Sequence, residues 1–167
     1  MSFLIKSDTA CWRDFPPEPL VRGRADVLLD FALEALRAGA SKVYLAFCDG
    51  VVVEVERTSA RSAKELAGEL PHMRRYAASL RDVAGTWRGP VFYLHESGTD
   101  IDRVNIPRGS LIVVGDQDGL APEDEEFLRG RATWVSIGPL PYLSWFCAPY
   151  VARRVGLAPA VSSARTA

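Results

Sequence analysis

Three short apolar segments, each followed by a glycine-containing turn, constrain the fold of this chain most strongly. They cover residues 91–95, 110–114 and 133–137, and each leads into a polar or Gly-Pro-rich turn. Apolar runs bounded by turn residues are typical of buried strands. In an open α/β sheet, the loops at the carboxyl ends of neighbouring strands bind small ligands. We therefore predict a cofactor site in the second half of the chain.

Strands and helices alternate along the remaining sequence. Apolar residues spaced three to four apart predict helices, and short apolar runs beside turn residues predict strands. Further strands are expected at 3–5, 42–47 and 51–55, the last two as a hairpin, and helices at 24–39, 62–66, 71–83, 122–128 and 144–155, with a kink or break at Pro149. This alternation predicts an α/β fold, a mostly parallel sheet with helices on both faces.

Length and composition indicate one globular domain. Of the 167 residues, we assign 1–157 to this domain and 158–167 to a frayed, disordered tail, because the tail is small and polar. The net charge of −1 gives no global basic field, so nucleic-acid binding has to rest on a local patch. Arg74, Arg75 and Arg81 could form one, although a charged helix face is more often simply solvated.

The three cysteines, Cys11, Cys48 and Cys147, include no closely spaced pair. Their odd number argues against a disulfide framework and against a zinc site. No metal-ligand spacing is present. The apolar run at residues 3–5 is too short for a secretory signal, and no stretch is long enough to span a membrane. A reduced, cytoplasmic setting fits these features best.

Several motifs occur in an order that resembles a known family. They are Tyr93-Leu94-His95, Gly115-Asp116 with Gly119, the segment 136–140 (SIGPL) and Cys147, with weaker matches at residues 3–6 and at Gly23-Arg24-x-Asp26. The sequence resembles the SPOUT methyltransferases, and within them the archaeal-type tRNA pseudouridine-54 N1-methyltransferases. Each motif is weak alone, but their order and spacing over some fifty residues are fairly specific.

The resemblance implies a fold, a cofactor and a partner. The fold would carry a carboxy-terminal trefoil knot, an exception to the rule against threaded chains. The cofactor would be S-adenosylmethionine, bent inside the knot and held mostly by backbone groups. The protein would act as a homodimer, with its substrate, a modified uridine of tRNA, bound at the subunit interface.

The resemblance also assigns residues to the cofactor and to the substrate. Cofactor-binding positions would be Leu94, His95, Gly115, Asp116, Gly119, Ile137, Gly138, Pro139, Leu140 and Cys147. The Arg24 and Asp26 segment would lie near the substrate. Glycine suits such loops because it adopts positive φ and lets the backbone approach a ligand. Cys147 could equally be a small buried apolar residue, and Arg24 and Asp26 could belong to an ordinary helix start.

Methyl transfer to a ring nitrogen needs alignment and a proton acceptor. The sulfonium already activates the methyl group, so the protein has to hold the nucleophile in line. Asp26 is the first candidate for the base and Asp116 the second, while Arg24 could stabilise charge on the carbonyls of the substrate ring. This chemistry requires no metal.

The segment 141–146 (PYLSWF) departs from the resembled family, which has a polar, His-containing stretch there. Its aromatic residues could stack on a flat ring or pack against a second subunit. The change leaves two alternatives open. One is the same cofactor chemistry on a small molecule, free nucleoside or peptide; the other is a non-enzymatic knotted module that binds RNA or protein.

Overall fold

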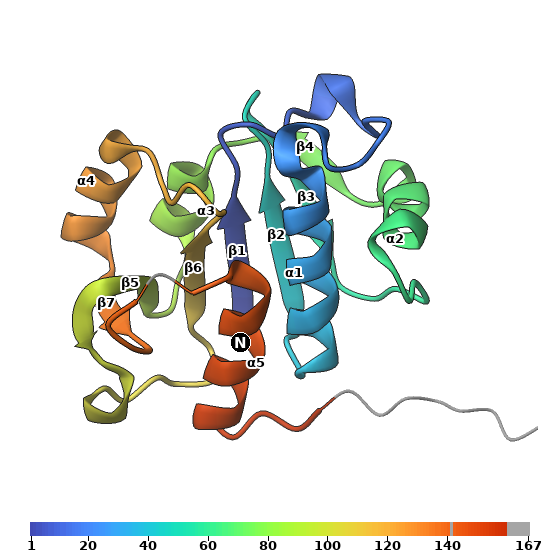
Figure 1. Ribbon diagram of the computed structural model, residues 1–167. Coiled ribbons are helices and arrows are strands. Elements are labelled where there is room, and N and C mark those ends of the chain that lie inside the picture. The colour runs from blue at the N-terminus through green and yellow to red at the C-terminus, as the bar shows by residue number, and fades with distance from the viewer. Residues whose placement is uncertain (141, 160–167) are drawn as a thin grey trace, which may run out of the picture.

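The computed structural model describes residues 1–140 and 142–159, and its centre is a seven-stranded sheet (Figure 1). The strands are β1 (Ser2–Lys6), β2 (Lys42–Ala46), β3 (Val51–Val55), β4 (Arg75–Ala77), β5 (Val91–Asp100), β6 (Leu111–Gly115) and β7 (Thr133–Ser136). They lie in the order β4-β3-β2-β1-β6-β5-β7. Only β3 pairs antiparallel with its neighbours, so the predicted mostly parallel sheet is confirmed.

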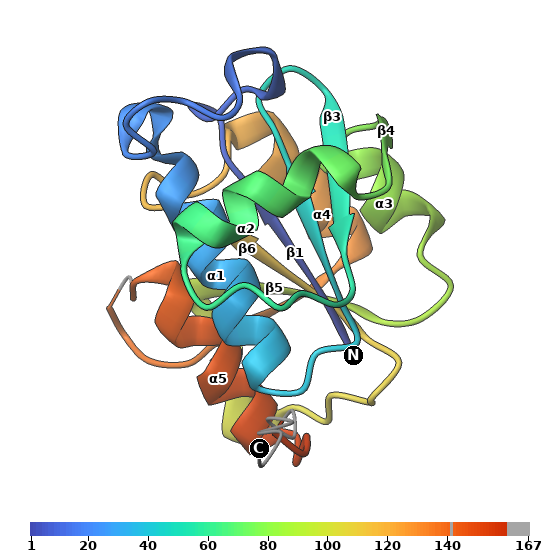
Figure 2. The same ribbon diagram turned by 90° about the vertical axis from the view of Figure 1, so that its right-hand side faces the viewer.

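Five α-helices cover both faces of this sheet in the described part of the chain, as predicted. They are α1 (Ala25–Arg37), α2 (Ala63–Glu69), α3 (Leu80–Thr86), α4 (Pro122–Arg131) and α5 (Ser144–Arg154). One hydrophobic core lies beneath α1, α2 and α5, and a second lies beneath α3 and α4. Figure 2 shows α1 and α5 on one side of the strands and α3 on the other.

The packing of α5 against α1 brings the carboxy-terminal segment back to the first helix. Gly39, just after α1, has a φ of +100°, and a Cβ there would lie 2.1 Å from the carbonyl oxygen of Ala158. Glycine at this position therefore ends α1 and also lets the chain after α5 lie against that end. Residues 160–167, which contain most of the predicted tail, lie outside the described residues.

The predicted helix at 71–83 is wrong. Arg75–Ala77 forms β4, which pairs with β3, and a new helix starts at Leu80. Ser79 and Asp82 explain the break, because each caps the other's backbone in a reciprocal capping box. Elsewhere the boundaries shift little, except that β5 continues to Asp100 through an irregularity in its pairing with β7. The last helix continues through Pro149 without interruption.

A disulfide joins Cys11 and Cys48, so the expectation of a chain without one is wrong. The spacing of 37 residues gave no sign of this pair. The pair forms because the loop after β1 folds over the end of β2, where the carboxylate of Asp49 accepts backbone hydrogen bonds from Trp12 and Arg13, each 2.9 Å long.

Among the described residues, no helix has both the length and the apolar character to cross a bilayer.

Candidate functional site

A cavity of about 410 Å³ lies at the carboxyl ends of β5, β6 and β7 and at the start of α5. It brings together nine of the ten residues that the sequence assigned to a cofactor. These are Leu94, His95, Gly115, Asp116, Gly119, Ile137, Gly138, Leu140 and Cys147. The tenth, Pro139, is not among the lining residues. Residues up to 53 positions apart in the sequence thus share one wall, as expected for loops at one edge of a parallel sheet.

The loop after β6 turns back tightly. Asp116 and Gly119 form an isolated bridge, and Gly119 has a φ of +78°. A Cβ on Gly115 would lie 2.7 Å from the backbone carbon of Gly119, a separation that real Cβ atoms essentially never show. The turn therefore requires glycine at Gly115, where the backbone itself forms part of the cavity wall.

Two hydroxyl groups fix the neighbouring loops. Ser136 Oγ donates to the carbonyl oxygen of Gly138 over 2.7 Å and accepts from the backbone N–H of Gly138 over 3.1 Å. Ser144 Oγ, in the first turn of α5, donates to the carbonyl oxygen of Gly115 over 2.9 Å. The last helix is thereby tied to the end of β6, and the loop after β7 is braced by Ser136.

Asp116 is the most unusual titratable group of the cavity. Its side chain is buried, and Oδ1 accepts the backbone N–H of Asp118 over 2.9 Å. Oδ2 accepts no hydrogen bond from the described residues. Burial raises the pKa of this carboxyl group, and the hydroxyl of Ser7 and the N–H of Asp118 partly oppose the shift. A buried carboxylate with a free oxygen and a raised pKa is suited to accept a proton or to bind a cationic ligand.

Glu125 forms a further part of the wall that sequence reasoning missed. Its Oε1 accepts the hydroxyl of Tyr93 over 2.9 Å and lies 3.6 Å from His95 Nε2. Burial and this carboxylate raise the pKa of the Tyr93 phenol. Trp134 packs edge-on against Tyr93 and beside His95. The acidic start of α4 was visible in the sequence, but the pairing with Tyr93 depends on tertiary packing.

Cys147 lies buried behind the cavity. Its thiol donates to the carbonyl oxygen of Leu143, and burial raises its pKa to about 11. A thiol with such a pKa stays protonated at neutral pH and is a poor nucleophile. The geometry therefore fits a packing role for Cys147.

Arg24 and Asp26 lie at the start of α1, outside the lining of this cavity. Their side chains form a two-point ion pair, with Arg24 Nε 3.2 Å and Nη2 3.1 Å from the two carboxylate oxygens. Arg24 has a φ of 57°, which is rare for a side chain with a Cβ. The structure of a single chain thus unites Asp116 with the predicted cofactor residues but leaves the Arg24–Asp26 pair apart.

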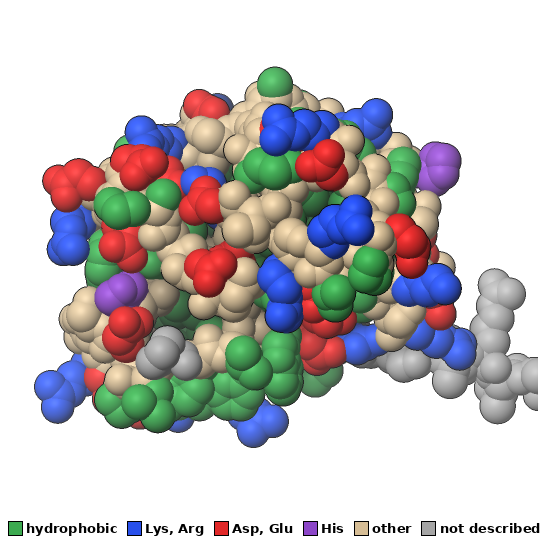
Figure 3. All heavy atoms as spheres, turned by 45° about the horizontal axis from the view of Figure 1, so that its top comes forward, with side chains coloured by type: hydrophobic (Ala, Val, Ile, Leu, Met, Phe, Trp, Pro, Cys, Tyr) green, Lys and Arg blue, Asp and Glu red, His purple; other side chains and the backbone are tan. Residues whose placement is uncertain are grey.

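Large hydrophobic side chains are exposed next to the cavity and along α5. They are Leu140, Tyr142, Leu143, Trp145 and Phe146, and they are between 40% and 63% exposed. Figure 3 shows hydrophobic side chains gathered along the lower edge of the molecule. An apolar patch of several large side chains is a common mark of a protein interface.

Comparison with known proteins identifies close relatives in sequence. No protein-family model matches the chain. A tRNA (pseudouridine(54)-N(1))-methyltransferase of Pyrobaculum aerophilum is 37% identical over 132 residues, which cover 79% of this chain and 95% of the relative. A protein of the same name from Thermococcus onnurineus is 49% identical over 61 residues, but that match covers 36% of this chain and 30% of the relative.

Solved structures share the fold at lower sequence identity. Archaeoglobus fulgidus Nep1 bound to S-adenosylhomocysteine is similar with a TM-score of 0.69 and 16% identity, over 94% of this chain and 99% of that one. The SpoU methyltransferase AviRb of Streptomyces viridochromogenes, in complex with its cofactor AdoMet, has a TM-score of 0.56 and 11% identity, over 93% of this chain and 56% of that one.

Proposed function

Because this chain belongs to the tRNA (pseudouridine(54)-N(1))-methyltransferase family, we propose that it transfers a methyl group from S-adenosylmethionine to N1 of a pseudouridine in tRNA. The observation that carries this proposal is the 37% identity to a relative that the match covers almost completely. The cavity formed by the matched loops gives the proposal a physical site.

The residues of the cavity fit this cofactor. S-adenosylmethionine supplies a methyl group already activated on a positively charged sulfur. Glu96, Asp116, Asp118 and Glu125 give the cavity an acidic lining, which suits a ligand with a sulfonium and an ammonium group. In this proposal the backbone of the loop at 137–140 holds the adenine, as the resemblance implies, and the turn at Gly115 lines the same cavity.

The protein then has two tasks at the reacting atoms. It holds the ring nitrogen of the substrate in line with the methyl group, and it accepts the proton of that nitrogen. We assign the role of proton acceptor to Asp116, because its Oδ2 is free of hydrogen bonds from the described residues and the pKa of its carboxyl group is raised. Asp26 remains the competing base, held in its ion pair with Arg24.

A homodimer would bring the separated parts together. In this proposal the apolar surface of Leu140, Leu143, Trp145 and Phe146 packs against a second copy. The Arg24–Asp26 pair of one protomer then approaches the cavity of the other, where Arg24 stabilises charge on the substrate carbonyls.

We place the protein in the cytoplasm with its tRNA substrate. We also infer that the segment leading into α5 is threaded as a trefoil knot.

The test joins three measurements on the purified protein. Calorimetry with S-adenosylhomocysteine should give saturable binding, and sedimentation should give a dimer that Phe146→Glu converts to monomers. Incubation of S-adenosylmethionine with a pseudouridine-containing tRNA should add one methyl group to the pseudouridine, located by mass mapping. Methylation of a free nucleoside but not of tRNA would support the small-molecule alternative, and absence of cofactor binding would leave only a non-enzymatic role.

A further inference from the structure

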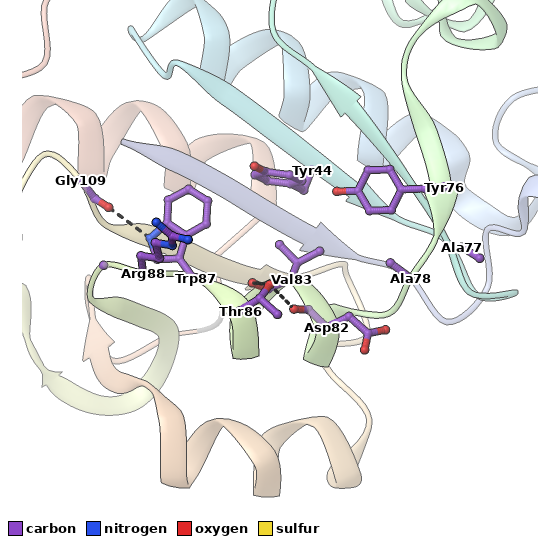
Figure 4. A pocket seen from close by; sticks show the side chains of 11 residues that line it. Tyr44, Tyr76, Ala77, Ala78, Asp82, Val83, Thr86, Trp87, Arg88 and Gly109 are labelled. Atoms are coloured by element: carbon purple, nitrogen blue, oxygen red, sulfur yellow. Dashed lines mark hydrogen bonds between the residues drawn. The ribbon is translucent and has the colours of Figure 1, made fainter.

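A second cavity, of about 610 Å³, lies between α3 and the strands β2 and β4 (Figure 4). It shares no lining residue with the cofactor cavity. Its residues come from four places in the chain and include three aromatic rings. Tyr44 is on β2 and Tyr76 on β4, while Trp87 follows α3. A cavity of this size is large enough for a nucleotide-sized ligand.

The aromatic rings are held in place by bonds to their polar ends. Trp87 Nε1 donates to the carbonyl oxygen of Gly109 over 3.1 Å, and the hydroxyl of Tyr76 donates to Glu54 Oε1 over 2.9 Å. Tyr44 packs edge-on against Trp87, with ring centroids 6.1 Å apart. Since the polar ends of Trp87 and Tyr76 are engaged with the protein, these two rings offer mainly apolar surface to the cavity, where a flat ring can pack.

The acidic groups near these rings are already neutralised or engaged. Glu54 is buried and paired with Lys42 Nζ at 2.7 Å, in addition to its bond with Tyr76. Asp82 accepts the backbone N–H and the hydroxyl of Ser79 at the start of α3. Lys42 thereby neutralises the charge of Glu54. The bonds from Ser79 lower the pKa of Asp82, which keeps its negative charge, and Figure 4 shows its side chain pointing away from the three aromatic rings.

Two arginines supply positive charge at the rim. Arg88 is exposed and forms no ion pair with any described residue. The side chain of Arg74 is 75% exposed, and its guanidinium lies 5.6 Å from the centroid of the Tyr76 ring. Arg74 lies 3.9 Å from Glu54 in an ion pair, so Arg88 supplies the unpaired charge among the described residues of the rim. Aromatic faces beside an unpaired arginine are a combination that binds single-stranded nucleic acid, because bases stack and phosphates pair with cations.

We propose that this cavity, the aromatic groove, binds an unpaired nucleotide of the RNA substrate, with its base against Tyr44, Tyr76 and Trp87 and its phosphate on Arg88. The proposal rests on the proposed function. Tyr44, Leu4, Val113 and Tyr93 occupy one row across four neighbouring strands. At roughly 4.8 Å per strand, the backbone of Tyr44 lies about 14 Å from that of Tyr93 in the cofactor cavity. A single RNA can contact both.

The first experiment changes charge at the rim. Binding of the tRNA to wild-type protein and to Arg88→Glu is measured by filter binding over a series of salt concentrations. We expect about tenfold weaker binding for Arg88→Glu and a shallower salt dependence, by about one ion contact. Arg61→Glu is the matched control, because Arg61 is exposed, lies just before α2 on the other face of the sheet, and forms no ion pair with a described residue. It should bind tRNA like wild type.

The second experiment tests stacking. Tyr76→Leu should weaken tRNA binding by roughly tenfold, within the range for loss of an aromatic platform, and Tyr76→Phe should restore most of it. Thermal melting verifies that both variants fold. Equal tRNA binding by Arg88→Glu and Arg61→Glu, or equal loss in Tyr76→Leu and Tyr76→Phe, would overturn the aromatic groove as an RNA site. A change in self-association instead of RNA affinity would also overturn it.

The two proposals fail separately. Affinity for S-adenosylhomocysteine should be the same in wild type, Arg88→Glu and Tyr76→Leu. If wild type binds this compound and methylates tRNA while both groove variants bind tRNA normally, the groove proposal falls and the methyltransferase stands. If wild type binds no S-adenosylhomocysteine, the proposed function falls first.

Discussion

The two halves of the molecule build their functional surfaces in different ways. In the carboxy-terminal half, three loops and the start of α5 meet at one edge of the sheet and enclose a cavity within one chain. In the amino-terminal half, the ion pair of Arg24 and Asp26 lies at a separate surface, at the start of α1, where the loop that contains Cys11 of the Cys11–Cys48 disulfide ends. A parallel sheet gathers the ends of its strands automatically, whereas the Arg24–Asp26 pair reaches the cavity only through the second subunit that we propose.

The largest effect is expected from adding a side chain inside the tight turn after β6. Gly115→Val places side-chain atoms where the backbone of Gly119 lies 2.7 Å from a Cβ, and we expect S-adenosylhomocysteine binding to be lost. The free energy of unfolding should fall by about 3 kcal/mol, as for other overpacked sites. Calorimetry and denaturant unfolding measure the two changes.

Gly68→Ala is the matched control for that substitution. Gly68 lies in α2, and a Cβ there meets nothing within 4 Å. Alanine should therefore stabilise the helix slightly, by about 0.5–1 kcal/mol, and leave cofactor binding unchanged. Normal binding by Gly115→Val would mean that the turn is not the cofactor loop.

The next effect separates the two candidate bases. Asp116→Asn should lower the rate of methyl transfer by about 10²- to 10³-fold while affinity for S-adenosylhomocysteine changes little. Because the pKa of Asp116 is raised, the wild-type rate should fall on acidification at a higher pH than a normal carboxyl group would dictate. This fall of the rate at low pH should be absent in Asp116→Asn. If it persists there and disappears in Asp26→Asn, the base is Asp26.

Asp116 also makes a prediction about stability. Its pKa is higher in the folded than in the unfolded protein, so the group favours folding at low pH and opposes it as pH rises through the folded pKa. Asp116→Asn should therefore raise the melting temperature at neutral pH and have little effect near pH 3. Thermal melts across this pH range measure the change. A lower melting temperature of Asp116→Asn than of wild type at neutral pH would contradict the raised pKa of Asp116.

Reduction of the disulfide should have a moderate effect that is confined to the amino-terminal half. Opening a loop of 37 residues should lower the free energy of unfolding by about 2–4 kcal/mol. Because this loop leads to Arg24 and Asp26, the KM for tRNA should rise more than the Kd for S-adenosylhomocysteine. The double variant Cys11→Ser/Cys48→Ser should reproduce the change and no longer respond to reductant.

The smallest effect is expected at Cys147. A buried thiol with a pKa of about 11 has no nucleophilic role, so Cys147→Ala should keep the rate of methyl transfer within a few fold. The loss of one buried sulfur should cost about 1 kcal/mol of unfolding free energy. Complete loss of activity in a folded Cys147→Ala variant would show that the thiol takes part in the reaction.

The carboxy-terminal half was largely predictable from sequence because its signals are local. Strands that end in glycine turns place Leu94, Gly115 and Gly138 at one edge for any parallel sheet. The helix predicted at 71–83 failed because its apolar spacing suited a helix, while Ser79 and Asp82 start one later and Arg75–Ala77 pairs with β3.

Other features depend on contacts between distant residues. The Cys11–Cys48 pair and the bond between Tyr93 and Glu125 join segments that only the folded chain brings together. The position of Arg24 and Asp26 was also not predictable, since a motif states which residues are present but not which cavity they face. Sequence pattern therefore located the candidate cofactor cavity better than it located the parts around it.

The hydrogen bond from Ser144 to Gly115 has a consequence for how a newly made molecule matures. It ties the final helix to a strand made well before it, and residues on both sides of this bond line the same cavity. A growing polypeptide still attached to its ribosome cannot complete that enclosure until α5 has emerged. Competence to hold a ligand should thus arise only after α5 has been made, and fragments that stop before α5 should bind none.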